Sequence, residues 1–211
     1  MDKLLNNLSH LMNHREKAGD AGFSELMAQI LSQWPDVGWE LGSDPVSPDI
    51  DRLSLSVDDV PELRSNPTLA AQLPLKGEGW IIGLGIPPRD WEMYFEAEMN
   101  GKDLKIEGSE WFWTIVDVDP EPDAEVDQQM MITIAPSSQF EKLTDDELGE
   151  LAGIIVTGEL GESNVSRFVR WIDVSPTRQG SGEWFPMDSL RKRFVEKFPD
   201  CEYGDWLATS R

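Results

Sequence analysis

Thiols, imidazoles and long apolar stretches are scarce in this chain. Its 211 residues include one cysteine, Cys201, and two histidines. A single cysteine excludes an internal disulfide framework and a zinc site built from several thiolates, and it fits a reducing compartment. The longest apolar run, WIIGLGI, is too short to cross a bilayer, and the first residues lack the apolar stretch of a signal peptide. The sequence therefore predicts a cytoplasmic protein without a membrane segment.

Basic side chains are also few compared with acidic ones. The chain has 18 Lys and Arg against 40 Asp and Glu, which gives a formal net charge of −22 at pH 7. A field of this sign repels the phosphates of nucleic acids and anionic lipids, and it attracts cationic partners. A basic protein is therefore the expected partner, and direct binding of nucleic acid or membrane is not expected. The alternative is that the acidity mainly provides solubility.

The acidic excess is concentrated in one part of the chain. Residues 111–160 carry one basic and 12 acidic side chains, which is half of the net charge. Within them, VDVDPEPDAEVD has an acidic side chain at every second position: Asp117, Asp119, Glu121, Asp123, Glu125 and Asp127. In an extended chain these carboxylates line one edge about 6.5 Å apart. The stretch is interpreted either as an acidic ladder that faces a cationic partner or as a solvated loop between two strands.

The same stretch begins like a calcium-binding loop, with acidic residues at alternate positions. An EF-hand needs glycine at the sixth position and a bidentate glutamate at the twelfth. The chain has Pro122 and Gln128 at these positions. An EF-hand is therefore excluded.

A second acidic group, Asp145 and Asp146, lies at the start of a predicted helix. Thr144 is placed as its N-cap, and Glu147 completes a capping box. Stabilisation of the helix N-terminus accounts for these acidic residues, and they are also candidates for contact with a basic partner.

Tryptophan is abundant, with nine residues, which is too many for a disordered acidic chain. Trp91, Trp111 and Trp113 lie on apolar faces of predicted strands and are expected in the core. Trp39, in a predicted linker, and Trp184, in the turn-rich QGSGEWFP, are the candidates for a protein interface. Tryptophan is enriched in binding hot spots, which supports this interpretation.

Helical periodicity marks both ends of the chain. Apolar residues recur at three- and four-residue steps through residues 1–34, which predicts an N-terminal helical pair with a break at AGDAG. Residues 35–50, rich in Pro, Asp and Ser, predict a linker. A C-terminal amphipathic helix is expected at about 188–198, with the basic side chains Arg191, Lys192, Arg193 and Lys197 directed outward.

From about residue 51 the apolar period changes to two, which is typical of half-buried strands. In WEMYFEAEMNGKDLKIEG, the pair Asn100 and Gly101 between alternating runs predicts a hairpin. Further strands are expected at 52–57, 79–84, 111–118, 129–135, 154–159 and 166–174. Residues 51–211 are thus expected to form an α+β sheet domain, with a mainly antiparallel twisted sheet of five to eight strands. The C-terminal helix is expected to pack on this sheet, and the domain to form one cooperative unit with 1–34.

No catalytic or metal-binding signature is complete. His10 and His14 have a spacing at which two imidazoles can share a metal, but HLMNH lacks the glutamate of a zinc hydrolase and no third ligand is evident. Both are therefore expected on an exposed helix face. The acids around Cys201 would raise the pKa of its thiol, which disfavours a nucleophile. The glycines of KGEGWIIGLGIPP miss the spacing of a phosphate loop and favour close backbone packing or a bulge.

The sequence favours a non-catalytic binding protein, without a cofactor or metal, that neutralises or escorts a basic protein. An immunity protein against a bacterial toxin fits this character, although no motif carries the hypothesis. Two alternatives stay open. One is an enzyme with a dispersed carboxylate site, with or without a metal ion. The other is a structural or self-assembling protein, a homo-oligomer in which the basic helix at 188–198 docks on the acidic segment of another copy.

Overall fold

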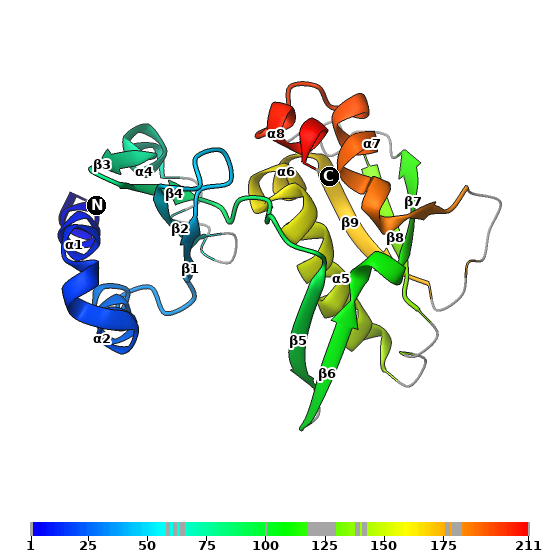
Figure 1. The fold of residues 1–211 in the computed structure, drawn as a ribbon, viewed down its shortest axis with the longest axis horizontal. Coiled ribbons are helices and arrows are strands. Elements are labelled where there is room, and N and C mark those ends of the chain that lie inside the picture. The colour runs from blue at the N-terminus through cyan, green and yellow to red at the C-terminus, as the bar shows by residue number, and fades with distance from the viewer. Residues whose placement is uncertain are drawn as a thin grey trace. The chain divides into compact units, whose positions relative to one another are not determined.

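The structure is a computed structural model that describes residues 2–57, 60, 63, 66–99, 101–117, 130–137, 140, 143–175, 178 and 183–210. The chain has an α+β fold and divides into two compact units, Met1–Ile86 and Pro87–Arg211, each with its own hydrophobic core (Figure 1). This division differs from the expected one, which placed residues 51–211 in a single sheet domain. The strands of residues 51–86 share a core with the N-terminal helices, and this shared core places the boundary after Ile86.

Two helices open the first unit, α1 (Asp2–Asn13) and α2 (Arg15–Ile30). The predicted break at AGDAG is confirmed, because Gly19 has a φ of 64° and interrupts α2. Glycine tolerates this left-handed conformation without a Cβ clash. The predicted apolar stripe of α1 is buried: Leu4, Leu5, Leu8, Leu11 and Met12.

A four-stranded sheet completes the first unit. It contains β1 (Gly38–Ser43), β2 (Asp51–Ser56), β3 (Leu75–Gly77) and β4 (Trp80–Leu84), with a short helix, α4 (Pro67–Gln72), between β2 and β3. The strand order is β1-β2-β4-β3, with β2 and β4 parallel and the other pairs antiparallel. The predicted linker 35–50 thus contains a strand. Its Pro, Asp and Ser residues lie mainly after β1, so composition averaged over the whole segment hid the strand.

Side chains with polar groups connect the parts of this unit. Trp80 donates its indole N–H to Oδ1 of Asn13 at 2.8 Å, which joins β4 to the end of α1. Arg52 is buried in the sheet, where Nη1 lies 3.3 Å from Oδ2 of Asp44. A Cβ at Gly77 would collide with the Trp80 ring, so the expected close packing at the KGEG glycines is confirmed there.

The second unit contains two sheets. A hairpin of β5 (Tyr94–Met99) and β6 (Lys102–Glu107) stands alone, and Gly101 in its turn has the predicted positive φ, at 70°. The other sheet has the order β10-β7-β8-β9 and is formed by β7 (Phe112–Asp117), β8 (Met130–Ala135), β9 (Val169–Val174) and β10 (Phe185–Pro186). A 3-10 turn, η1 (Gly108–Glu110), connects the two. The described strands therefore form three small sheets, not the single sheet of five to eight strands that periodicity predicted.

Helices cover one face of the four-stranded sheet in the second unit. They are α5 (Asp145–Leu160), α6 (Glu162–Phe168), α7 (Leu190–Lys197) after the 3-10 turn η3 (Met187–Ser189), and α8 (Gly204–Thr209). The predicted capping box is confirmed, because Thr144 Oγ1 accepts from the Glu147 N–H and Glu147 Oε2 accepts from the Thr144 N–H.

Two strand predictions in this region need correction. The strand predicted at 154–159 is wrong, because these residues continue α5, and the segment 166–168 ends α6 before β9 begins. The β-branched run at the start of IIVTGEL, Ile154 to Thr157, favours a strand locally. The helix nonetheless continues because its apolar residues face the core at helical spacing: Leu148, Leu151, Ala152, Ile155 and Val156.

A buried ion pair joins α5 to α7. Glu159 and Arg191 are 0% and 2% exposed, and Nε of Arg191 lies 3.0 Å from Oε2 of Glu159. Trp91 donates its indole N–H to Oε1 of the same glutamate at 2.8 Å. The prediction that Arg191 faces solvent with the other basic residues of this helix is therefore wrong. The spacing of apolar residues within one helix does not show that a charged residue pairs with a buried carboxylate on another helix.

Candidate partner-binding surface

The sheet β10-β7-β8-β9 has two faces of different character. Side chains alternate along each strand, so Trp113, Ile132 and Ile172 point toward the helices and the core. On the opposite face, the strand register aligns Val116, Met131 and Trp171 across β7, β8 and β9. We call these three residues the apolar row. Val116 is 44% exposed and Trp171 is 55% exposed, so this row meets solvent.

Trp171 is the side chain that distinguishes this face. All nine tryptophans lie in the described ranges, and Trp171 alone among them is an exposed large apolar residue. The guanidinium of Arg170 lies 4.4 Å from its ring centroid, a cation–π distance. An exposed tryptophan on the last strand of a sheet is a suitable anchor for a partner.

An acidic hollow lies farther along β9, beginning at the residue after Trp171. It has a volume of about 370 Å³ and is lined by Asp145, Asp146, Gly149, Ile172, Asp173 and Val174. We call it the acidic pocket. The β8–α5–β9 connection forms it, because β8 and β9 are parallel and the returning helix begins at their carboxyl ends (Figure 1). The amino end of α5 also stabilises the two carboxylates in its first turn.

The long acidic segment joins this sheet at the opposite end. Asp119, Glu121, Asp123, Glu125 and Asp127 lie outside the described residues. The attachment points are described: Asp117 at the end of β7 pairs with Met130 at the start of β8. The segment therefore connects two antiparallel strands, as predicted. Its attachment points and the acidic pocket lie at opposite ends of β8, about 17 Å apart along the strand at 3.3 Å per residue.

The two tryptophans singled out from the sequence occupy other places. Trp39 lies on β1 in the first unit, half-buried, with its ring centroid 5.7 Å from that of Phe23. Trp184 lies just before β10 and is also half-buried. Its indole N–H is buried and has no hydrogen-bond partner among the described residues. Neither residue lines the acidic pocket.

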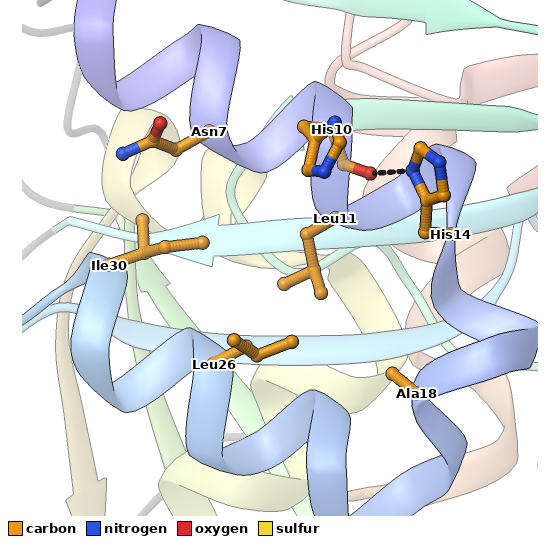
Figure 2. Close-up of a pocket in the computed structure, with 7 residues that line it drawn as sticks. All are labelled: Asn7, His10, Leu11, His14, Ala18, Leu26 and Ile30. Atoms are coloured by element: carbon orange, nitrogen blue, oxygen red, sulfur yellow. Dashed lines mark hydrogen bonds between the residues drawn. The ribbon is translucent and has the colours of Figure 1, made fainter.

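A second hollow lies between α1 and α2 in the first unit. Its volume is about 270 Å³. Figure 2 shows apolar side chains from both helices, with the imidazole of His10 on α1 and that of His14 just after α1; the lining residues are Asn7, His10, Leu11, His14, Ala18, Leu26 and Ile30. The predicted exposure of both histidines is confirmed. Nδ1 of His14 donates to the carbonyl oxygen of His10 at 2.8 Å, so one of its ring nitrogens is already used. Two imidazoles supply only half of the ligands of a tetrahedral zinc ion.

Two features of the described part of the chain bear on metal binding and on thiol chemistry. No three His, Cys, Asp or Glu side chains there are arranged to hold a metal ion. Cys201 is 8% exposed, and burial raises the pKa of its thiol, with a smaller contribution from the neighbouring charge of Asp200. The predicted direction is therefore confirmed, although burial outweighs the acids. A protonated thiol is a poor nucleophile.

Comparison with protein families, with curated proteins and with solved structures finds no match for this chain. Within the described ranges, none of the helices has the length and apolar character needed to cross a membrane.

Sequence reasoning missed Trp171 as a surface residue. The strand VRWIDV alternates so that Trp171 and Asp173 share one face, while Ile172 and Val174 share the other. An aspartate on the same face as the tryptophan is the signal that indicates exposure. The alternation was available, but which positions of this face meet solvent is a tertiary feature: Val116 and Trp171 are exposed, whereas Thr114 is buried.

Proposed function

We propose that this protein is a non-catalytic acidic binding protein that neutralises or escorts a basic protein partner in the cytoplasm. The observation that supports the proposal most is the apolar row that ends in exposed Trp171 beside the acidic pocket. Trp171 supplies a large apolar side chain for a partner to bury, and the pocket supplies carboxylates that attract basic side chains.

Charge would govern the encounter with the partner. The second unit carries 12 basic and 27 acidic residues, against 6 and 13 in the first unit. Complementary charge raises association rates and suppresses wrong partners more than it raises affinity. The acidic pocket and residues 117–127 would therefore steer a basic surface toward this sheet.

The apolar row would govern the lifetime of the complex. Affinity differences between related complexes come mostly from differences in dissociation rate. Buried aromatic anchors carry a large share of the binding energy that slows dissociation. The Trp171 ring is already 55% exposed, so burying it against a partner requires little structural rearrangement.

A toxin inhibitor is the class of binding protein that this surface suits best. Proteins that act on nucleic acids or anionic membranes need a basic surface. An acidic protein that covers this surface would block the activity by occupying the site. An immunity protein against a bacterial toxin is therefore our specific proposal.

The first experiment identifies the partner and tests steering. The tagged protein is used to capture its partner, which mass spectrometry identifies. The association rate is then measured for the triple variant Asp145→Asn, Asp146→Asn and Asp173→Asn. The amide that replaces the Asp173 carboxylate keeps an oxygen that accepts the hydrogen bond from the Val174 N–H, so the pocket keeps its shape. The rate should fall about 10-fold at low salt and much less at high salt.

A matched control removes the same charge elsewhere. Glu96, Glu98 and Asp103 are exposed on the β5–β6 hairpin, and Glu96→Gln, Glu98→Gln and Asp103→Asn change the net charge equally. An association rate that falls equally in both triple variants would remove the pocket from the proposal.

The long acidic segment is tested separately. Asp119, Glu121, Asp123 and Glu125 are replaced by Asn or Gln, and the association rate with the captured partner is measured at low and high salt. An unchanged rate would contradict the steering role of residues 117–127. Sedimentation of the protein alone at two salt concentrations tests the self-assembling alternative, in which association weakens as salt rises.

A further inference from the structure

Strand β9 is the last strand of its sheet. The order β10-β7-β8-β9 leaves one side of β9 without a paired strand among the described residues. At the other edge, β10 has only two residues, whereas β9 has six. Edge strands present a row of unused backbone groups that a further strand is able to join.

The register shows which backbone groups of β9 face outward. Ser175 N–H donates to the Ile134 carbonyl at 2.8 Å, so residue 175 faces β8, and by alternation residues 173 and 171 do as well. Ile172 and Val174 therefore direct their N–H and C=O groups away from the sheet. The Val174 N–H donates to Oδ1 of Asp173 at 2.9 Å. The backbone of Ile172 has no partner on this side among the described residues.

The space beside these groups is open. The acidic pocket of about 370 Å³ is lined by Ile172, Asp173 and Val174 of the edge, so α5 does not fill this side of β9. Trp171, the residue before Ile172, is exposed on the opposite face of the sheet. The unused backbone of Ile172, the hollow and the exposed ring thus lie along one short stretch of strand.

We propose that an extended segment of the partner, carrying Lys or Arg, binds by adding to β9 as a further strand. This inference rests on the proposed function and specifies how the partner binds. The backbone of the segment pairs with Ile172, its basic side chains reach Asp145, Asp146 and Asp173, and an apolar side chain covers Trp171. Backbone pairing gives affinity in this mode, and the alternating side chains give specificity.

Charge identifies the occupant. A second copy of this chain would bring its own three aspartates against the same three, inside a unit that already has more than twice as many acidic as basic residues. Like charges directly opposite each other destabilise strand pairing. The segment therefore belongs to a different, cationic protein.

Two synthetic peptides test the mode of binding. One is an acetylated peptide of about seven alternating lysines and valines, long enough for one strand. The other has the same sequence with every backbone nitrogen methylated, which keeps the charge but removes all backbone donors. The unmodified peptide should bind the full-length protein at least about 10-fold more tightly, because each hydrogen bond lost to methylation weakens binding several-fold. Equal affinity would overturn strand addition.

Amide hydrogen exchange gives a second readout that needs no variant. In the free protein the Ile172 amide should exchange fast, while the Asp173 amide, which faces β8, is protected. At saturation with the unmodified peptide, the Ile172 amide should slow at least about 10-fold, as expected for a newly formed hydrogen bond. An Ile172 amide that exchanges equally fast at saturation would overturn strand addition.

The triple variant in the acidic pocket separates this inference from the proposed function. If Asp145→Asn, Asp146→Asn and Asp173→Asn weaken both peptides equally and the Ile172 amide stays unprotected, charge binding stands and strand addition fails. If the pocket variant and the hairpin control variant weaken the unmodified peptide equally, the pocket has no role; strand addition beside it then fails, and the pocket is removed from the proposed function. If the protein alone dimerises and its Ile172 amide becomes protected, the strand that adds to β9 belongs to a second copy of this chain, and the cationic segment is overturned as the occupant.

Discussion

Each unit of this protein contains a four-stranded sheet that ends in a six-residue edge strand with a tryptophan, β1 with Trp39 and β9 with Trp171. Trp39 is half-buried against Phe23, whereas Trp171 is 55% exposed. The two strands also differ in what lies around the tryptophan, because Trp39 packs on Phe23 whereas the residues after Trp171 line the acidic pocket. The same residue type at equivalent sheet positions therefore serves packing in one unit and is available for binding in the other.

The units also differ in how they stabilise a buried charge. Arg52 in the first unit pairs with Asp44, whose side chain is 11% exposed and also accepts from the backbone N–H groups of Val46 and Ser47. Arg191 in the second unit pairs with Glu159, which is fully buried. Removing one partner of a buried pair leaves an uncompensated charge, and the penalty grows with burial.

The largest effect is expected from Glu159→Ala. It leaves the Arg191 guanidinium buried without its carboxylate and removes the acceptor of the Trp91 indole N–H. The free energy of unfolding should fall by about 3–5 kcal/mol. Urea denaturation followed by tryptophan fluorescence measures it. Glu96→Ala is the control, because its pair with Lys105 is exposed and contributes at most about 1 kcal/mol. A loss for Glu159→Ala no larger than that of Glu96→Ala would contradict the assigned role of the pair.

The two edge tryptophans should respond in opposite ways. Trp39→Ala should lower the free energy of unfolding by about 2 kcal/mol, because it removes a half-buried ring from the core of the first unit. Trp171→Ala should change it by less than about 1 kcal/mol and should instead speed dissociation of the captured partner. Thermal denaturation and binding kinetics on both variants provide the comparison. Equal losses of stability with unchanged dissociation would remove the distinction between the strands.

The capping box at the start of α5 should have a moderate effect. Thr144→Ala removes the oxygen that accepts from the Glu147 N–H, and the free energy of unfolding should fall by about 1 kcal/mol. Thr144→Ser keeps the oxygen and is the matched control. A serine variant as unstable as the alanine variant would show that the cap does not contribute through this hydrogen bond.

The smallest effect is expected at Cys201 and depends on pH. Burial raises the pKa of the folded thiol above its ordinary value of 9.0. The protonated thiol therefore stabilises the fold fully below pH 9.0, and this contribution is lost as pH rises through the folded pKa. At pH 8 the folded thiol should react with a disulfide reagent more slowly than the urea-unfolded thiol. Equal rates would contradict the burial of this residue.

Local signals predicted the parts of the fold that depend on neighbouring residues. The capping box at Thr144, the turn at Gly101 and the break at Gly19 each involve only a few adjacent positions, and all three are confirmed. Each depends on backbone geometry or a side-chain oxygen that the sequence shows directly.

Features that depend on distant residues were not predicted. The strand expected at 154–159 is helical because burial of the apolar residues of α5 outweighs local strand propensity. Arg191 is buried because it pairs with Glu159, and this partner lies 32 positions away in the chain. The acidic pocket arises in the same way. Asp145 and Asp173 meet only through the β8–α5–β9 connection, so no spacing in the sequence indicates their proximity.

The central claim is that the acidic pocket on the second unit receives a cationic partner. The most direct measurement compares association rates with the captured partner at low salt for the pocket variant, Asp145→Asn with Asp146→Asn and Asp173→Asn, and the hairpin variant, Glu96→Gln with Glu98→Gln and Asp103→Asn. The pocket variant should associate about 10-fold more slowly than the hairpin variant, because steering acts through charges at the docking site. Equal rates in the two variants would contradict the claim.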